Sequence, residues 1–250
     1  MGALEMPYDI RCIIPSDRYC RLEGYRLVPA SRARHDELEA VEAERISTTT
    51  VLYINEKGEE RTLTLLELST LLNFAYSSTL IWMSEGDLRN MQVVWGLSDW
   101  TDSSQSSISP SALNLGIVYQ LENGLFCPAI SIKWVDAVVG HGLFTTEDLE
   151  NDEFIIEYTG VVLETQSPSA YSLLYPCLEG GHEVNASDTG NLARFINHSP
   201  QPNASFQRVY HEGIVHTVVR LTQSIKTGTQ ITVDYSPSYW VSRNIKPQLL

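Results

Sequence analysis

The residues best suited to chemistry lie in four short motifs in the second half of the chain. They are Gly140-His141-Gly142, Tyr158-Thr159-Gly160, Asn197-His198 and Asp234-Tyr235. A Gly-x-Gly turn lets the backbone approach a ligand closely. Taken alone, each motif is more commonly a hairpin turn, a capped turn or the end of a half-buried strand. Their joint order therefore carries more weight than any one of them.

The stretch from 191 to 203 is the centre of this set. An apolar pair precedes Asn197-His198, and Pro200 and Pro202 then end any regular structure. We expect a short helical turn followed by a rigid loop that presents the Asn and His side chains. Loops of this kind beside a core are where binding and catalytic residues concentrate.

The order and spacing of the motifs resemble those of the SET-domain protein lysine methyltransferases. The resemblance covers about residues 125–240. It implies transfer of methyl groups from S-adenosyl-L-methionine to lysine side chains of a protein substrate. The matching segments are Gly140–Phe144, Glu153–Gly160, Gly190–Ser199 with Pro202-Asn203, and Gly228–Tyr235.

This resemblance implies roles for individual residues at the cofactor. The Gly-x-Gly backbone would bind the methionine end, Asn197 its amino or carboxylate group, and the His198 backbone the adenine, while Arg194 would brace the same turn. The implied cofactor residues are Gly140, His141, Gly142, Arg194, Asn197, His198, Tyr235 and Trp240.

The implied catalytic residues are two tyrosines. Tyr235 would orient the substrate lysine near the transferred methyl group, without serving as a strong base, and Tyr171 would hydrogen-bond the lysine amine. Tyr171, Phe206 and Val233 would line the lysine channel. Because Phe206 stands where a tyrosine hydroxyl would hold a water, we expect di- or trimethylation over monomethylation.

The chain departs from the family pattern at its cysteines. Pro200 replaces the usual cysteine after Asn-His-Ser, and no cysteine follows Cys177. None of the four cysteines forms a CxxC pair, so we expect no metal site. The cap over the cofactor would then come from Tyr239 or Trp240, although a tail that is only anchored on the core is an equal alternative. The family's compact bacterial type, found in chlamydiae among others, has this character.

The expected fold is mostly β, with several small antiparallel sheets and, by resemblance, a C-terminal pseudoknot. Short strand-like runs alternate with Gly, Asn and Pro, and no long helix separates them, which disfavours a doubly wound parallel sheet. The predicted strands are 125–135, 143–145, 153–163, 171–175, 182–186, 203–210, 213–221 and 229–235.

An α/β-mixed N-terminal region precedes these strands. Helical propensity predicts a helix at 35–45, and β-branched residues predict a strand at 47–55. Thr64 and Glu67 fit a capping box that opens a helix with an apolar face, and another helix start lies at Ser84. That apolar face comprises Leu65, Leu68, Leu72 and Tyr76.

The predicted domains follow from a serine-rich linker at 98–112. They are an N-terminal region at 1–112 of unknown role, a SET domain at 113–240 and a C-terminal tail at 241–250. The leucine faces of the N-terminal helices are candidates for a homodimer contact.

Charge and apolar runs limit the partners. The 250 residues include 31 acidic and 17 basic ones, for a net charge of −14. This disfavours direct nucleic-acid binding and suits a basic partner such as a histone or histone-like tail, although solubility alone explains it equally well. No signal peptide or membrane span is expected, which favours a cytoplasmic protein, or one delivered to a host nucleus if it is an effector. The alternative function is a non-catalytic SET-fold interaction module.

Overall fold

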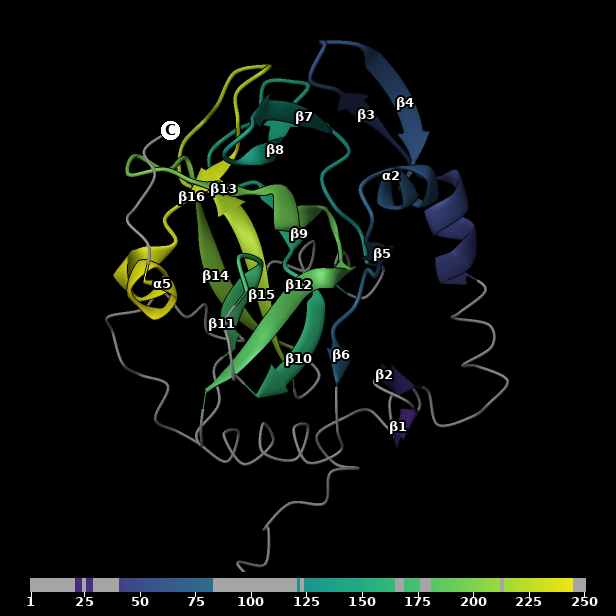
Figure 1. The fold of residues 1–250 in the computed structure, drawn as a ribbon, viewed down its shortest axis with the longest axis vertical. Coiled ribbons are helices and arrows are strands. Elements are labelled where there is room, and N and C mark those ends of the chain that lie inside the picture. The colour runs from purple at the N-terminus through teal and green to yellow at the C-terminus, as the bar shows by residue number, and fades with distance from the viewer. Residues whose placement is uncertain are drawn as a thin grey trace, which may run out of the picture.

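The computed structural model describes residues 21–23, 26–28, 41–82, 121, 124–164, 169–175, 181–211 and 214–244. The serine-rich linker, the predicted helix start at Ser84 and three of the cysteines lie outside these residues. The described chain is mostly strand, arranged in several small sheets (Figure 1). The predicted fold class is confirmed. No helix in the described parts of the chain is long and apolar enough to cross a bilayer.

The largest sheet has seven strands and combines residues from both halves of the chain. Its order is β1-β2-β6-β10-β12-β11, and β5 pairs with β12 beside this path. The strands are β1 (Arg21–Glu23), β2 (Arg26–Val28), β5 (Ala75–Tyr76), β6 (Ile81–Trp82), β10 (Gly160–Glu164), β11 (Ser172–Tyr175) and β12 (His182–Gly190).

Three smaller sheets and a few helices complete the described structure. Their orders are β4-β3-β7-β8, β14-β15-β9 and β13-β16. The helices are residues 41–48, α2 (Leu65–Leu71), the 3-10 helix η3 (Leu192–Phe195) and α5 (Ser236–Arg243). The strands are β3 (Thr50–Ile54), β4 (Glu60–Thr64), β7 (Ile130–Asp136), β8 (Gly140–Thr145), β9 (Phe154–Glu157), β13 (Asn197–His198), β14 (Ala204–His211), β15 (Ile214–Leu221) and β16 (Thr232–Val233).

Strand pairing joins the N-terminal region to the C-terminal half. β3 runs parallel to β7, β5 parallel to β12, and β6 parallel to β10. Figure 1 shows the β3–β4 hairpin beside β7, next to α2. The N-terminal segment thus completes the sheets that carry the site, while the domain boundary at residue 112 stays a prediction because it lies outside the described residues.

Helix α2 begins at the predicted capping box. Thr64 Oγ1 accepts a hydrogen bond from the Glu67 N–H at 3.1 Å, and Glu67 Oε2 accepts one from the Thr64 N–H at 2.8 Å. Leu65 and Leu68 are fully buried. The leucine face offered for a dimer contact therefore points into the core, and the exposed leucine of α2's first turn is Leu66.

Two local predictions were wrong about backbone conformation. The Gly140-His141-Gly142 motif was expected to form a turn, but it opens strand β8. The turn precedes it, where Asp136 Oδ1 accepts the N–H groups of Val138 and Val139. Only Gly140, with φ of +74°, keeps a turn conformation.

The second difference concerns the stretch at 191–203. The short helical turn is present as η3, which the Asn191 side chain caps by accepting the Ala193 N–H at 3.0 Å. Asn197 and His198 then lie in strand β13, where a loop was expected. The reason is non-local, because their partner strand β16 lies far along the chain and no local pattern reveals it.

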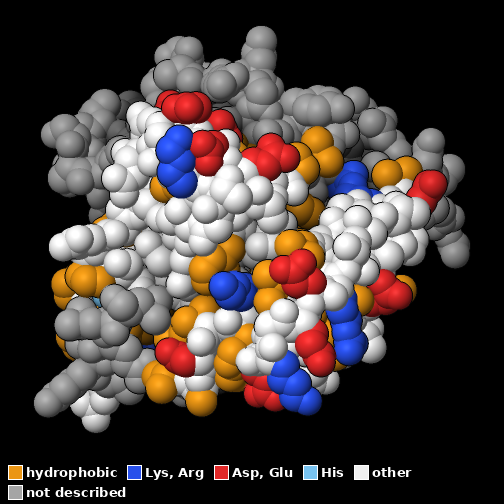
Figure 2. Space-filling view, turned by 90° about the horizontal axis from the view of Figure 1, so that it is seen from above, with side chains coloured by type: hydrophobic (Ala, Val, Ile, Leu, Met, Phe, Trp, Pro, Cys, Tyr) orange, Lys and Arg blue, Asp and Glu red, His pale blue; other side chains and the backbone are white. Residues whose placement is uncertain are grey.

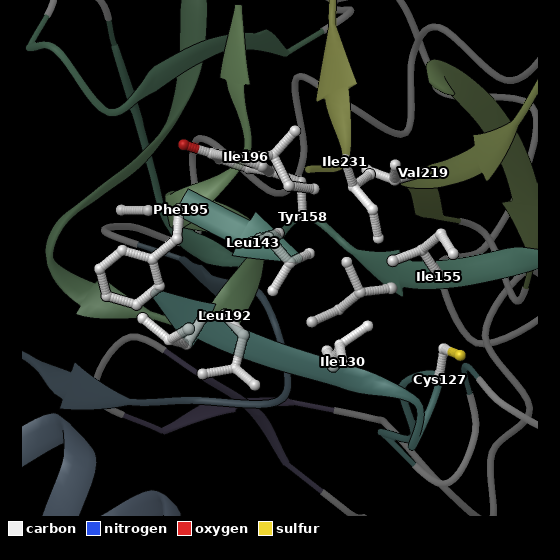
Figure 3. Close-up of a cluster of buried hydrophobic side chains, with 14 of the residues drawn as sticks. Cys127, Ile130, Leu143, Ile155, Tyr158, Leu192, Phe195, Ile196, Val219 and Ile231 are labelled. Carbon is white, nitrogen blue, oxygen red and sulfur yellow. The ribbon is translucent and has the colours of Figure 1, made fainter. Parts of the chain in front are cut away.

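A buried apolar cluster lies behind this stretch (Figure 3). Phe195 and Ile196 pack with Leu143 of β8, Ile155 of β9 and Ile231, which precedes β16. Each of these side chains is at most 5% exposed. Asn197 and His198, which follow Phe195 and Ile196 directly, are therefore held on a close-packed apolar base.

Candidate active site

Two distant segments meet at the centre of the site. β13 pairs in parallel with β16, so that Asn197 lies opposite Thr232 and His198 opposite Val233. Asn203 fixes this pairing, since its amide donates to the Gln230 carbonyl at 2.8 Å and accepts the Thr232 N–H at 2.9 Å. The predicted meeting of the segments around Asn197 and Tyr235 is confirmed.

Asn197 also reaches the Gly-x-Gly strand. Its Nδ2 donates a hydrogen bond to the His141 carbonyl at 3.1 Å. A Cβ added to Gly142 would lie 2.5 Å from Gln230 Nε2, so no larger residue fits there without displacing a neighbour. Gln230 Nε2 is itself buried and has no hydrogen-bond partner among the described residues. The structure thus joins these predicted cofactor residues and adds Gln230 beside them.

His141 is held by aromatic residues from three elements. Its Nε2 lies 3.2 Å from the Tyr53 hydroxyl of β3, and its ring contacts those of Trp134 and Phe195 edge-on. Burial lowers the pKa of His141, which favours the neutral ring near neutral pH. Sequence reasoning missed Tyr53, because nothing local to β3 indicates that it faces β8.

His198 is buried on the other side of the pairing. Its Nδ1 accepts the Tyr235 N–H at 3.2 Å. The Trp240 ring stands edge-on to the His198 ring, with centroids 4.9 Å apart. An aromatic surface therefore flanks the end of β13, and whether it caps a cofactor stays a prediction.

Two tyrosine hydroxyls point at main-chain carbonyls. Tyr235 donates to the Ile196 carbonyl at 2.6 Å, and Tyr158 donates to the Tyr171 carbonyl at 2.6 Å. Burial raises the pKa of both hydroxyls. Both hydroxyls are therefore protonated donors at neutral pH, and the role of Tyr235 toward a lysine stays a prediction.

Arg194 is buried in the protein, and its predicted role at the cofactor stays a prediction. Its Nε donates to the Ala186 carbonyl at 2.9 Å. Its guanidinium sits between two rings, 4.5 Å from the Phe74 centroid and 4.3 Å from the Tyr171 centroid. Burial lowers its pKa. In this position Arg194 supports Tyr171 and joins it to Phe74 of the N-terminal region.

The three predicted channel residues have different surroundings. Tyr171 is 37% exposed, Phe206 of β14 stands edge-on to Tyr158 at 5.9 Å, and Val233 is fully buried in β16. Their roles toward a lysine stay predictions, as do those of the predicted cofactor residues.

Helix α5 covers the site from the C-terminal side. The centroid of Tyr239 lies 4.5 Å from that of Tyr235, and Trp240 stacks on Tyr235 at 6.0 Å. The predicted boundary between the SET domain and the tail, at residue 240, falls within this helix, which runs to Arg243. Sequence reasoning also missed Tyr158 as a hydroxyl donor, although its motif had been singled out.

We compared the chain with known protein families, relatives and solved structures. The pattern of the SET domain matches residues 140–236, the span that contains both the Gly-x-Gly strand and Tyr235. The chain contains a SET domain. This domain match leaves out the N-terminal segment that completes its sheets.

Relatives of this SET domain are histone-lysine methyltransferases by name. Over 107 residues the chain is 34% identical to histone-lysine N-methyltransferase ASHH2 of Arabidopsis thaliana, covering 39% of this chain and 6% of that protein. Over 109 residues it is 36% identical to histone-lysine N-methyltransferase 2B of Homo sapiens, covering 40% of this chain and 4% of that protein. The chain thus spans a small fraction of these relatives.

A solved structure supports the fold over a longer stretch. ATXR5, crystallised in complex with mono-methylated histone H3.1, superposes with a TM-score of 0.54 at 17% identity. The match covers 69% of this chain and 85% of that one. Because 69% exceeds the span of the SET domain alone, the likeness in fold extends beyond it.

Proposed function

We propose that this protein transfers methyl groups from S-adenosyl-L-methionine to lysine side chains of a basic protein, a histone or histone-like tail. The observation that carries the proposal is the junction of Asn197, the Gly140–Gly142 strand and Tyr235. A non-catalytic interaction module has no need of a buried tyrosine donor beside such a cradle.

The residues present fit the cofactor. Gly142 packs so closely against Gln230 that a Cβ would clash with its amide, Gln230 Nε2 is a buried donor without a partner among the described residues, and Asn197 adds an amide. These groups suit an amino acid carboxylate, while Trp240 beside His198 suits a flat base. When bound, S-adenosyl-L-methionine supplies an electrophilic methyl group on a sulfonium.

The substrate lysine must be neutral to act as a nucleophile, although its free pKa is about 10.4. A channel among the rings of Tyr158, Phe206 and Tyr235 would desolvate the ammonium and lower that pKa. Tyr235 and Tyr158 stay protonated, so the lysine proton leaves to water. The chain contributes mainly by aligning the lysine amine with the methyl group. Holding two reacting groups in line is how proximity lowers a reaction barrier most.

Charge and the relatives' names support this substrate class. A net charge of −14 attracts basic chains over a distance. On the face shown in Figure 2, acidic and basic side chains are interspersed and form no single acidic patch. The charge therefore steers a basic tail, and the site itself selects the lysine. Action on histones would place the protein in a nucleus.

The test is methylation of a histone mixture with isotope-labelled cofactor, followed by mapping of the modified lysines by mass spectrometry. Tyr235→Phe is the matched control. We expect label on one or a few lysines with the natural chain and much less with the variant. If no protein is labelled and calorimetry detects no cofactor binding, the chain is the interaction module instead.

A further inference from the structure

We propose that Arg243 is a positioning residue for the lysine channel. Its side chain holds helix α5 against the segment 169–172, which carries Tyr171. This inference rests on the proposed methyl transfer, because it names the residue that holds two walls of the channel together.

The contacts of Arg243 bridge α5 and this segment. Its Nε donates to the Ser169 carbonyl at 2.8 Å, and its Nη2 donates to the carbonyls of Ser169 and Ser172. Its guanidinium also lies 3.8 Å from the centroid of the Tyr239 ring. Hydrogen bonds from a charged donor are about twice as strong as neutral ones. One side chain thus ties the end of the helix to two backbone positions.

Every carbonyl of the segment accepts a side-chain donor. Arg243 binds those of Ser169 and Ser172, the Tyr239 hydroxyl binds that of Ala170 at 3.0 Å, and the Tyr158 hydroxyl binds that of Tyr171. Three of these four carbonyls are therefore held by α5. The conformation that presents the Tyr171 ring is set largely from the C-terminal helix.

The opposite face of the segment rests on β12. Ser169 Oγ donates to Asn185 Oδ1 at 3.2 Å and lies 2.8 Å from Ser187 Oγ. Arg194 supports the Tyr171 ring from the same side. The segment is thus clamped between β12 and α5, and Arg243 supplies the cationic part of the outer clamp.

Helix α5 depends on this clamp in turn. None of its side chains is buried, so little apolar burial holds it in place. Beyond the clamp, the rings of Tyr239 and Trp240 contact those of Tyr235 and His198. Loss of Arg243 should free the helix while leaving the buried core intact.

The experiment compares Arg243→Ala and Arg243→Lys with Val241→Ala, a change on the same helix at a side chain that is 78% exposed. Hydrogen–deuterium exchange is measured on the full-length protein over residues 169–175, 236–244 and, as a core reference, 140–145. Steady-state kinetics give KM for a histone peptide, and calorimetry gives Kd for S-adenosyl-L-methionine.

With Arg243→Ala we expect faster exchange at 169–175 and 236–244, unchanged exchange at 140–145, and a peptide KM at least about tenfold higher. The cofactor Kd should rise by less than the peptide KM, because Arg243 holds the segment that carries Tyr171, whereas Asn197 and the Gly140–Gly142 strand are held by other contacts. Arg243→Lys should give exchange rates and a peptide KM between those of the natural chain and Arg243→Ala, since one ammonium cannot make the forked contacts of a guanidinium. Val241→Ala should match the natural chain.

Unchanged exchange at 169–175 in both Arg243 variants would overturn the inference, whatever their activity. So would a cofactor Kd that rises as much as the peptide KM. If the alanine variant unfolds, the lysine variant decides by the same criteria. If the natural chain methylates nothing, the proposed function fails, while the exchange data still decide whether Arg243 holds helix α5 against the segment.

Discussion

Individual side chains at the site act mainly as donors. The hydroxyls of Tyr235 and Tyr158 are aimed at main-chain carbonyls, and burial raises the pKa of each. Neither can take a proton from a lysine at neutral pH. These side chains therefore act by orienting the reacting groups, so removing a single hydroxyl should lower the rate of methyl transfer without altering the fold.

Tyr235→Phe tests this directly. Removing the hydroxyl deletes an oriented dipole while the ring keeps its contacts with Tyr239 and His198. Loss of one such group typically lowers kcat by a factor of about 100 or more. We expect that fall with a cofactor Kd within about threefold of the natural value, measured by single-turnover kinetics and calorimetry. A fully active variant would remove Tyr235 from the mechanism.

Phe206→Tyr tests product specificity. Phe206 stands edge-on to Tyr158 and is only partly buried, so the change adds a polar hydroxyl beside the Tyr158 ring that can recruit a water. We expect the products to move from di- and trimethyl-lysine toward monomethyl-lysine, measured by mass spectrometry of a peptide at completion. An unchanged distribution would show that Phe206 does not line the channel.

At the scale of elements, strand β8 brings the Gly-x-Gly motif against Gln230. Gly142→Ala places a Cβ 2.5 Å from Gln230 Nε2 and 3.0 Å from the side chains of Phe144 and Val135. Overpacking of this kind costs about 1–3 kcal/mol. We expect cofactor binding at least about tenfold weaker by calorimetry, and a lower midpoint of urea unfolding. A variant that binds cofactor normally would show that Gln230 can move aside freely.

Elements also show what could be predicted from the sequence. The capping box at Thr64 and Glu67 was predictable because its donors and acceptors lie within one turn, and most strands of the second half were predictable from alternation and punctuation. Helix α5 was not, because no apolar periodicity marks it and its contacts come from segment 169–172. Among site residues, the motif positions came from resemblance, whereas Tyr53 and Arg243 required the fold.

At the scale of the whole molecule, both halves of the described chain contribute strands to the same sheets. β3, β5 and β6 pair with strands of the C-terminal half, and Phe74 stacks on Arg194. A chain restricted to residues 113–250 should therefore lose its cooperative thermal transition, because β7, β10 and β12 would each lack a partner. Differential scanning calorimetry checks this, with the full chain as control. A normal transition would mean that the predicted domain at 113–240 folds alone.

Buried tyrosines lower the stability of the folded protein at alkaline pH. Burial raises the pKa of Tyr76, Tyr158 and Tyr235 above the ordinary value near 10. Above pH 10 the unfolded chain releases these protons and the folded chain keeps them, so the free energy of unfolding falls as pH rises. We expect urea midpoints to drop between pH 9 and 11. Tyr158→Phe should show a smaller drop, and an equal one would contradict the burial effect.

The parallel pairing of β13 with β16 has a consequence for the order of folding. Because the β14–β15 hairpin separates β13 from β16 in the chain, their pairing is non-local and closes a loop, which costs entropy and slows its formation. The apolar core beneath can form first, and the cradle around Asn197 is completed only when the tail docks. Cofactor would then bind only completely folded molecules and, by mass action, stabilise the last step of their maturation.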